Sequence, residues 1–367
     1  MSQLTGILVV DAPASALNNA GEDKEARTDN AVAVKFIRAP GGQRFPYVSA
    51  QAVRFWLRTQ LSRQGGWTSS PVFRETKVAY TDAEPTKYAE DDLFGYMRAG
   101  SKSTDEKKAA KRAEIAAAST PVDAETGEVT RISPLRVGTM VSTVPVRPTG
   151  DFGTMARAEG DPVPYEHQFY RAHLKAPLSL DLTCAGTFFV SKRVGYKNLD
   201  AVRQENAKKA GAVDAKVRGF DTLRLPIATR QQRVAQLISA LGRLEGGAKQ
   251  TLHLTDTAPS ILFLAVCKSG NQPFMRVVGP DAVEENTVFR ADVLKEALTV
   301  YKDDIVSDIY VGWAKGFLDQ ERKKLEAEIK DGKYGDTGRT IHLKHPREIA
   351  DDLAKALQNS ANATWFD

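Results

Sequence analysis

The sequence predicts an α+β protein with an antiparallel sheet, and three features of the chain indicate this class. The N-terminal part reads as a strand, a long loop, a hairpin and a helix, an order typical of α+β domains. Strand-like alternation returns on both sides of a long excursion at residues 150–173, which predicts a protruding hairpin. The C-terminal third mixes further strands and helices, and no repeat of fixed period is present.

The composition is that of a chain able to bury a large core. Of the 367 residues, 42% are hydrophobic and 26% are charged, and the length allows one large domain or two to three small ones. The net charge is +5 and the pI is about 9.0. This mild excess of Lys and Arg is compatible with a polyanionic partner but does not require one.

Neither the cysteines nor the hydropathy indicate a special environment. Cys184 and Cys267 have no Cys or His neighbour at metal-ligand spacing, so no disulfide framework is predicted. The N-terminus lacks the pattern of a signal peptide, and no apolar run approaches the length of a membrane span. We therefore expect a cytoplasmic protein that has no cofactor and no contact with a membrane.

The opening unit begins with an apolar run at residues 4–10, which is typical of a buried strand. Residues 11–30 are small and polar and are interpreted as a long loop, a feature that is often functional in compact domains. Residues 31–38 alternate as a second strand. A Pro-Gly-Gly turn at residues 40–42 leads the chain into the next strand.

Residues 43–63 are predicted to form a short strand that leads into a helix, with Ser49 as its N-cap. The apolar side chains recur at three- and four-residue steps and share one face: Ala50, Val53, Leu57 and Leu61. Gln51, Arg54 and Arg58 share the opposite face. Guanidinium groups beside a helix N-terminus suit phosphate oxygens. A solvated basic face on an ordinary amphipathic helix is the alternative.

Residues 82–130 differ from the rest of the chain. A short helix is predicted at residues 91–97, with Leu93, Phe94 and Met97 facing inward. The stretch that follows has helix propensity but almost no large apolar residue, so we interpret it as a surface insert. Its basic run at residues 107–112 is expected to be solvated.

The predicted hairpin lies between strand-like segments at residues 132–149 and 176–190. Arg136, Met140 and Phe152 are candidates for contacts or wedges in this region. The alternative is that its aromatic side chains pack the hairpin onto its own domain.

The clearest predicted helix is at residues 229–244, ended by Gly246 and Gly247. Its apolar stripe consists of Val234, Leu237, Ile238, Leu241 and Leu244. A glycine turn with one cation, residues 247–251, leads to a strand predicted at 252–254. Such a turn can hold a phosphate, although it lacks the Walker spacing. The remaining predicted elements are strands at 260–268, 288–290 and 305–311 and helices at 291–301, 313–330 and 346–357.

The residues give little indication of catalysis. His342 and His345 lack a third ligand nearby, and His167 and His173 do not match a zinc-helix spacing. No nucleophile elbow is present. Three carboxylates in or beside the first loop could assist metal-dependent cleavage of a bound RNA, but their spacing singles none out: Asp11, Asp23 and Asp29.

Four stretches carry a resemblance to a known family: residues 6–19, 47–58, 151–170 and 247–250. The second contains Ser49, Gln51, Arg54 and Arg58 in the pattern Ser-x-Gln-x-x-basic-x-x-x-basic. With these stretches the chain resembles the backbone subunit of CRISPR Cascade complexes. The resemblance is closest to the DevR family of subtype I-B, within the RAMP superfamily.

Proteins of this family have an RRM-like (ferredoxin-like) palm with an antiparallel sheet, a helical finger insertion and a β-hairpin thumb. The resemblance implies that residues 1–81 and 196–367 form the palm, the latter with the C-terminal helices. Residues 82–130 then form a partly mobile finger insert, and residues 131–195 form the thumb hairpin with its flanking strands. It further implies RNA-backbone contacts from Asn18, Asn19, Ser49, Gln51, Arg54, Arg58, Arg136, Lys249 and Gln250.

The function implied by this resemblance is that of a non-catalytic subunit. Copies would assemble head to tail along a CRISPR guide RNA and form the backbone of a type I-B Cascade, with other Cascade subunits and, through the guide, target DNA as partners. Base pairing then reads sequence, so the protein is expected to hold phosphate and sugar. Two alternatives remain open. One is a metal-dependent ribonuclease of the type III backbone kind, using Asp23 or Asp29; the other is a regulatory binding protein.

Overall fold

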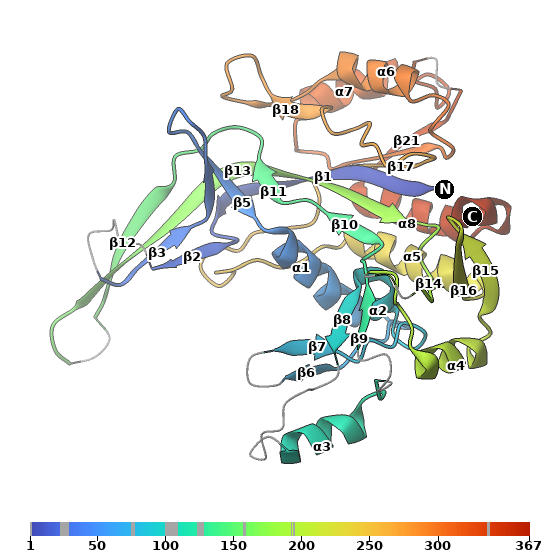
Figure 1. Ribbon diagram of the computed structural model, residues 1–367. Coiled ribbons are helices and arrows are strands. Elements are labelled where there is room, and N and C mark those ends of the chain that lie inside the picture. Colours follow the sequence, from blue (N-terminus) through green and yellow to red (C-terminus); the bar gives the residue numbers. More distant parts are fainter. Residues whose placement is uncertain are drawn as a thin grey trace.

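The structure, a computed structural model, describes residues 2–22, 29–74, 78–99, 109–122, 128–156, 159–191, 193, 195–335 and 338–367. Within these ranges the chain is a mixed α+β protein built on a 12-stranded sheet with helices on both faces (Figure 1). This confirms the predicted class, whereas the RRM-like palm and the domain boundaries stay predictions. The basic run at 107–112 lies outside the described side chains.

The sheet is organised around β1 (Gln3–Ser15), which pairs antiparallel with β13 (Val163–Asp181) and with β17 (Ile261–Cys267). Gly6 allows the last pairing to be close, because a Cβ there would lie 2.0 Å from the carbonyl oxygen of Phe263. The main strand order is β21 (Ile341–Lys344), β20 (Ile309–Trp313), β17, β1, β13, β11 (Met140–Ser142), β5 (Arg44–Val48) and β4 (Phe36–Arg38).

Four more strands join this sheet beside its main path: β2 (Asn19–Glu22), β3 (Ala31–Val34), β10 (Leu135–Val137) and β12 (Thr149–Met155). The pairing is antiparallel as predicted, except that β20–β21 and β3–β13 are parallel. Part of the expected loop at residues 11–30 is therefore strand, because β1 continues to Ser15 and β2 follows it; residues 23–28 lie outside the described part of the chain.

The alternating side chains of β1 fill two cores. Leu4 and Leu8 pack with α1 (Ala50–Ser62), α5 (Ile227–Leu241) and α8 (Pro346–Gln358). On the opposite face of the sheet, Ile7 and Val9 pack with α6 (Ala291–Val300) and α7 (Asp319–Glu328). Figure 1 shows the two helical layers on either side of the sheet. A strand buried on both faces requires the near-continuous apolar run found in the sequence.

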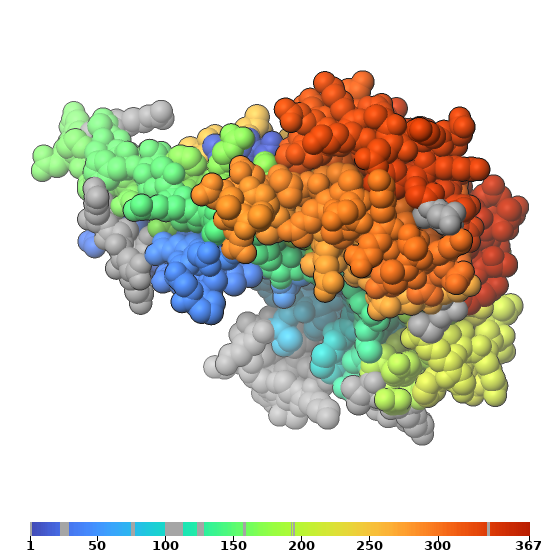
Figure 2. Space-filling model, turned by 90° about the horizontal axis from the view of Figure 1, so that it is seen from above, coloured from blue at the N-terminus to red at the C-terminus, as the bar shows by residue number. Residues whose placement is uncertain are grey.

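A protruding hairpin is present as predicted, but its strands are β12 and β13, which pair within the expected excursion and not in the segments that flank it. The two strands pair antiparallel from Thr149 opposite Phe169 to Met155 opposite Val163. The hairpin extends away from the body of the molecule in both views (Figures 1 and 2). Because β13 also pairs with β1 in the centre of the sheet, the protruding arm and the core share one continuous strand.

Smaller elements surround this frame. They are β6 (Val72–Arg74), β7 (Ala79–Thr81), α2 (Ala89–Phe94), β8 (Tyr96–Ala99), α3 (Ala109–Ala118), β9 (Glu128–Arg131), β14 (Thr187–Phe189), α4 (Ala201–Lys209), β15 (Val213–Val217), β16 (Phe220–Arg224), β18 (Val278–Pro280), β19 (Thr287–Phe289) and a 3₁₀ helix at Ser360–Phe366. No helix in the described ranges has the length and apolarity needed to cross a bilayer.

Several local predictions are wrong. Met97 is 70% exposed, because α2 ends at Phe94 and the next residues form β8, whose side chains alternate. The α5 helix ends at Leu241, whereas the sequence predicts that it continues to Leu244. Residues 252–254 form a turn and bend instead of a strand, and residues 313–330 contain the end of β20 and then α7.

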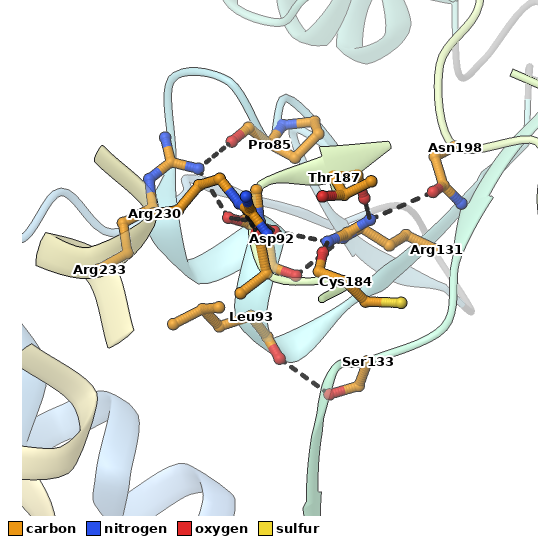
Figure 3. Close-up of polar contacts among 12 residues, drawn as sticks. Pro85, Asp92, Leu93, Arg131, Ser133, Cys184, Thr187, Asn198, Arg230 and Arg233 are labelled. Atoms are coloured by element: carbon orange, nitrogen blue, oxygen red, sulfur yellow. Dashed lines mark hydrogen bonds and ion pairs between the residues drawn. The ribbon is translucent and has the colours of Figure 1, made fainter. Parts of the chain in front are cut away.

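A buried ion network fixes α2 to the rest of the protein (Figure 3). Asp92 is completely buried, and its two carboxylate oxygens accept from Arg131 at 2.6 Å and from Arg233 at 2.9 Å. The backbone N–H of Gly186 donates to both oxygens at 3.0 Å. Arg131 also donates to the carbonyl oxygen of Cys184. One carboxylate thus joins α2, β9, α5 and the turn after β13.

We predict that Asp92→Ala strongly destabilises the protein, since two buried guanidinium groups lose their carboxylate. The expected loss is about 3–5 kcal/mol in the free energy of unfolding, measured by urea denaturation. The control is Glu205→Ala, which removes an exposed ion pair with Lys209 on α4 and should leave the unfolding midpoint nearly unchanged. Equal midpoints for both variants would contradict the role assigned to Asp92.

Candidate nucleic-acid interface

Three stretches that are far apart in sequence meet near the end of β1. The backbone N–H of Ala248 donates to the carbonyl oxygen of Leu17 at 3.0 Å. Asn18 donates through Nδ2 to the carbonyl oxygen of Tyr47 at 3.3 Å. Gly246 lies against Trp56 of α1, since an added Cβ would be 2.3 Å from the indole ring. Residues 17–19, 47–51 and 246–250 therefore form one surface, named here the loop junction.

The N-terminus of α1 belongs to the loop junction because Ser49 caps it as predicted. Its Oγ accepts from the N–H of Ala52 at 3.4 Å, and its carbonyl oxygen accepts from the N–H of Val53 at 3.1 Å. The first turn carries no acidic residue, and Gln51 is exposed. The positive end of the helix dipole is therefore not neutralised by a carboxylate of its own turn, which suits an anionic group.

Lys249 holds a strained backbone conformation at the loop junction. Its φ is +51°, a left-handed conformation that costs a non-glycine residue on the order of 1 kcal/mol. The side chain is partly buried, and burial lowers the pKa of its ammonium group. A partly desolvated cation at a constrained turn attracts an anion more strongly than a cation that is free in water.

Gln250 closes the turn from within. Its Nε2 donates to the carbonyl oxygen of Gly246, and its Oε1 accepts from the N–H of Thr255 at 2.9 Å. Gly247, at φ +113°, leaves space for this amide, because an added Cβ would lie 2.8 Å from Nε2. Both polar ends of Gln250 therefore already have partners inside the loop.

Asn18 and Asn19 lie on the same surface, each partly buried. The amide of Asn18 links β5 to the end of β1 through its bond to Tyr47, as described above. The buried Oδ1 of Asn19 accepts no hydrogen bond from the described residues. A buried acceptor without a donor is costly, so a hydroxyl or amine of a ligand would be a favourable partner there.

Arg54 and Arg58 are only partly exposed, because both guanidinium groups have partners inside the protein. Arg54 donates to the carbonyl oxygens of Phe94 at 2.6 Å and Leu135 at 2.8 Å. Burial, with the neighbouring charge of Arg58, lowers the pKa of Arg54 to about 10. Arg58 pairs with Glu90 at 3.0 Å and lies over the Phe94 ring. These two guanidinium groups join α1 to α2, and only Gln51 remains exposed on the predicted face.

The three residues considered near the hairpin have different surroundings. Arg136 is exposed on β10 and lines a cavity of about 80 Å³ together with Tyr196. Met140 is completely buried on β11, because that strand lies inside the sheet, so the idea that it contacts a partner is wrong. Phe152 is 59% exposed on β12, and the alternative of packing onto its own domain does not apply to it.

Sequence reasoning missed a row of rings on one face of the hairpin. Tyr165, His167 and Phe169 alternate along β13 and so point to the same side. His253, from the loop that begins at Gly246, stacks on Phe169 with ring centroids 5.1 Å apart. Its Nε2 lies 3.1 Å from Nε2 of His167. The alternation of rings was visible in the sequence, whereas the partner from the loop was not.

The described residues contain no group of three or more His, Cys, Asp or Glu side chains arranged to hold a metal ion. Of the three carboxylates considered for RNA cleavage, Asp23 lies outside the described residues and Asp29 is exposed. Asp11 faces His173 at 3.5 Å.

The fold is similar to that of chains in CRISPR RNA-guided surveillance complexes. A chain from a "CRISPR RNA-guided surveillance complex, pre-nicking" matches with a TM-score of 0.50 and 10% identity, over 97% of this chain and 100% of that one. A chain from a "CRISPR RNA-guided surveillance complex" gives a TM-score of 0.48 and 12% identity, over 96% and 99%. No protein-family model matches the sequence, and no curated protein is detectably similar.

We predict that Arg54→Ala destabilises the fold, because the carbonyl oxygens of Phe94 and Leu135 lose a charged donor in a partly buried site. The expected loss is about 2 kcal/mol in the free energy of unfolding, measured with urea. Gln51→Ala is the matched control on the same helix, and its exposed side chain should change stability by less than about 0.5 kcal/mol. A fully stable Arg54→Ala protein would show that these contacts contribute little.

Proposed function

We propose that this chain is a guide-RNA-binding subunit of a CRISPR RNA-guided surveillance complex. The observation that carries the proposal is the match of its fold, over nearly its whole length, to a chain of such a complex. The loop junction supports it independently, because three of the four family-like stretches meet there, and the hairpin supplies the fourth.

Within the loop junction, the groups best suited to an RNA backbone are the uncompensated N-terminus of α1, the exposed amide of Gln51 and the ammonium of Lys249. Such groups bind phosphate and sugar without reading bases. Asn19 offers an acceptor for a 2′-hydroxyl. Sequence would then be read by base pairing between the guide and the target.

The other predicted contacts have a second role. Arg54 and Arg58 hold α2 against α1, and Gln250 closes the loop. Asn18 links β5 to β1. In the proposed function these residues support the surface and contact RNA secondarily, whereas exposed Arg136 offers a separate contact beside β10.

We further propose that copies assemble head to tail along the guide, with the protruding hairpin reaching the neighbouring copy. A heterologous contact of this kind gives an open helix whose length a template can set. The exposed side chains near the hairpin tip would provide that contact: Phe152, Met155 and Val163. The type I-B assignment, DNA targeting through the guide, other Cascade subunits, a cytoplasmic location and the absence of catalysis belong to the same proposal.

The experiment that tests this proposal is nuclease protection of RNA that co-purifies with the protein after co-expression with a repeat-spacer transcript. The expected result is a ladder of cleaved positions at a regular interval, because each hairpin would distort the guide once per copy. Protein that elutes free of RNA as a small discrete oligomer would overturn the proposal and favour a regulatory role. Regular cuts in added complementary RNA, dependent on Mg²⁺, would favour the ribonuclease alternative.

Lys249→Gly is predicted to separate RNA binding from stability. Glycine accepts φ +51° without strain, so the variant should fold at least as stably as the wild type. Its RNA affinity should fall, and the slope of log affinity against log salt should decrease by roughly 0.7 for one lost phosphate contact. Lys249→Ala is the control that loses the same cation but keeps the backbone strain. Unchanged affinity in both variants, measured by filter binding, would remove Lys249 from the interface.

A further inference from the structure

The loop that carries Lys249 is held to the hairpin by a pair of histidines. His167, 6% exposed on β13, has its Nε2 3.1 Å from Nε2 of His253 in the loop. The residues on either side of His253 point outward, since Leu252 is 63% exposed and Leu254 is 89% exposed. The imidazole of His253 is thus the inward-facing side chain at the tip of this loop, and it rests on His167 and Phe169.

An Nε2–Nε2 hydrogen bond requires one imidazole to donate and the other to accept, so the accepting ring must be neutral. The carboxylate of Asp151 lies 3.4 Å from the same Nε2 of His167, which favours a proton on that nitrogen. His167 is then the donor and His253 the acceptor. Adding a proton to Nε2 of His253 places two N–H groups opposite each other and removes the hydrogen bond.

The charges around the pair also oppose protonation. From the loop, Lys249 is close enough to lower the pKa of both rings, and burial of the rings has the same sign and is the larger cause. From β12, Asp151 acts in the opposite direction but does not outweigh them. Glu22 of β2 is paired with Val32 of β3, and Val32 is paired with His167, so one strand separates Glu22 from His167. The described part of β3 carries no charged residue.

We propose that the His167–His253 pair is a proton-sensitive latch between the hairpin and the loop that presents Lys249. When both rings are neutral, the latch is closed and the loop tip is fixed to the hairpin. When Nε2 of His253 takes up a proton, the hydrogen bond is lost and the loop tip separates from β13. The effect of this opening on guide binding rests on the proposed function, whereas the latch itself is a property of the free chain.

The direction of the pH dependence follows from linkage. An opened loop exposes imidazoles with an ordinary pKa of about 6.5, whereas the closed pair has a lower pKa. The closed form is therefore fully favoured above about pH 6.5 and weakens as the pH falls from there towards the closed-state pKa. For one proton taken up, the opening equilibrium should rise by up to about tenfold per pH unit in this window.

The loop should remain attached to the body after the latch opens. Thr255 is buried and its hydroxyl lies 2.6 Å from that of Ser15 on β1. At the other end, Ala248 is bonded to Leu17. Opening is therefore confined to residues 249–254 and to the facing part of β13, and the protein as a whole stays folded.

The test uses the full chain without RNA, so its failure is distinct from a failure of RNA binding. Histidine ring nitrogens are followed by NMR from about pH 8 to about pH 5, and amide hydrogen exchange is measured over the same range, corrected for the intrinsic pH dependence. We expect His167 and His253 to titrate below the ordinary value, with exchange rising at residues 249–254 and 165–169. Ordinary, independent titration with no local rise in exchange would overturn the latch.

His253→Phe is the decisive variant, because phenylalanine can keep the stacking on Phe169 but cannot accept a hydrogen bond or a proton. In this variant, exchange at residues 165–169 should no longer depend on pH. His342→Gln is the control, because His342 lies on the edge strand β21, away from β13, where it pairs with Asp308. Removing this imidazole should leave the pH dependence of exchange at residues 165–169 unchanged. An equal pH response in wild type and His253→Phe would overturn the proposal.

Discussion

The structure depends on the burial of both faces of β1. Because its side chains alternate, Leu4 and Leu8 must fill one core while Ile7 and Val9 fill the other, and neither helical layer can shift without disturbing the strand. The pairing of β1 with β13 also fixes the base of the hairpin, because β13 continues beyond the body of the protein as one of the two hairpin strands. The end of β1 leads directly to Leu17, to which the Lys249 loop is bonded. A rigid central strand therefore positions both the hairpin and the loop junction.

The second constraint is the partnering of buried charge. Asp92 joins Arg131 and Arg233, while Arg54 and Arg58 join α1 to α2. Burial of an ion is tolerated only when partners and hydrogen bonds compensate it, so these arginines cannot be exchanged freely. Four guanidinium groups thus hold α2 against the rest of the protein. An arginine near a candidate site is therefore evidence of binding only after its internal partners are known.

The loop junction combines polar features of different origin. The helix N-terminus and the cation of the strained turn at Lys249 favour an anionic group, while the unpartnered oxygen of Asn19 favours a hydrogen-bond donor. The proposed histidine latch would control this surface, because it fixes the loop to the hairpin through a hydrogen bond that protonation of His253 at Nε2 removes.

The sequence alone determined the features that rest on local periodicity and capping. The apolar run of β1, the Ser49 cap, the stripe of α5 and the presence of a hairpin are all set by neighbouring residues, so they could be predicted. Only the tertiary structure decided which polar groups remain available. Arg54 and Gln250 look free in sequence, yet each has partners from distant or folded-back segments. His167 and His253 are 86 positions apart and meet only because the loop returns to the hairpin. Periodicity reports which face of an element is apolar, but contacts between distant elements depend on how the whole chain packs.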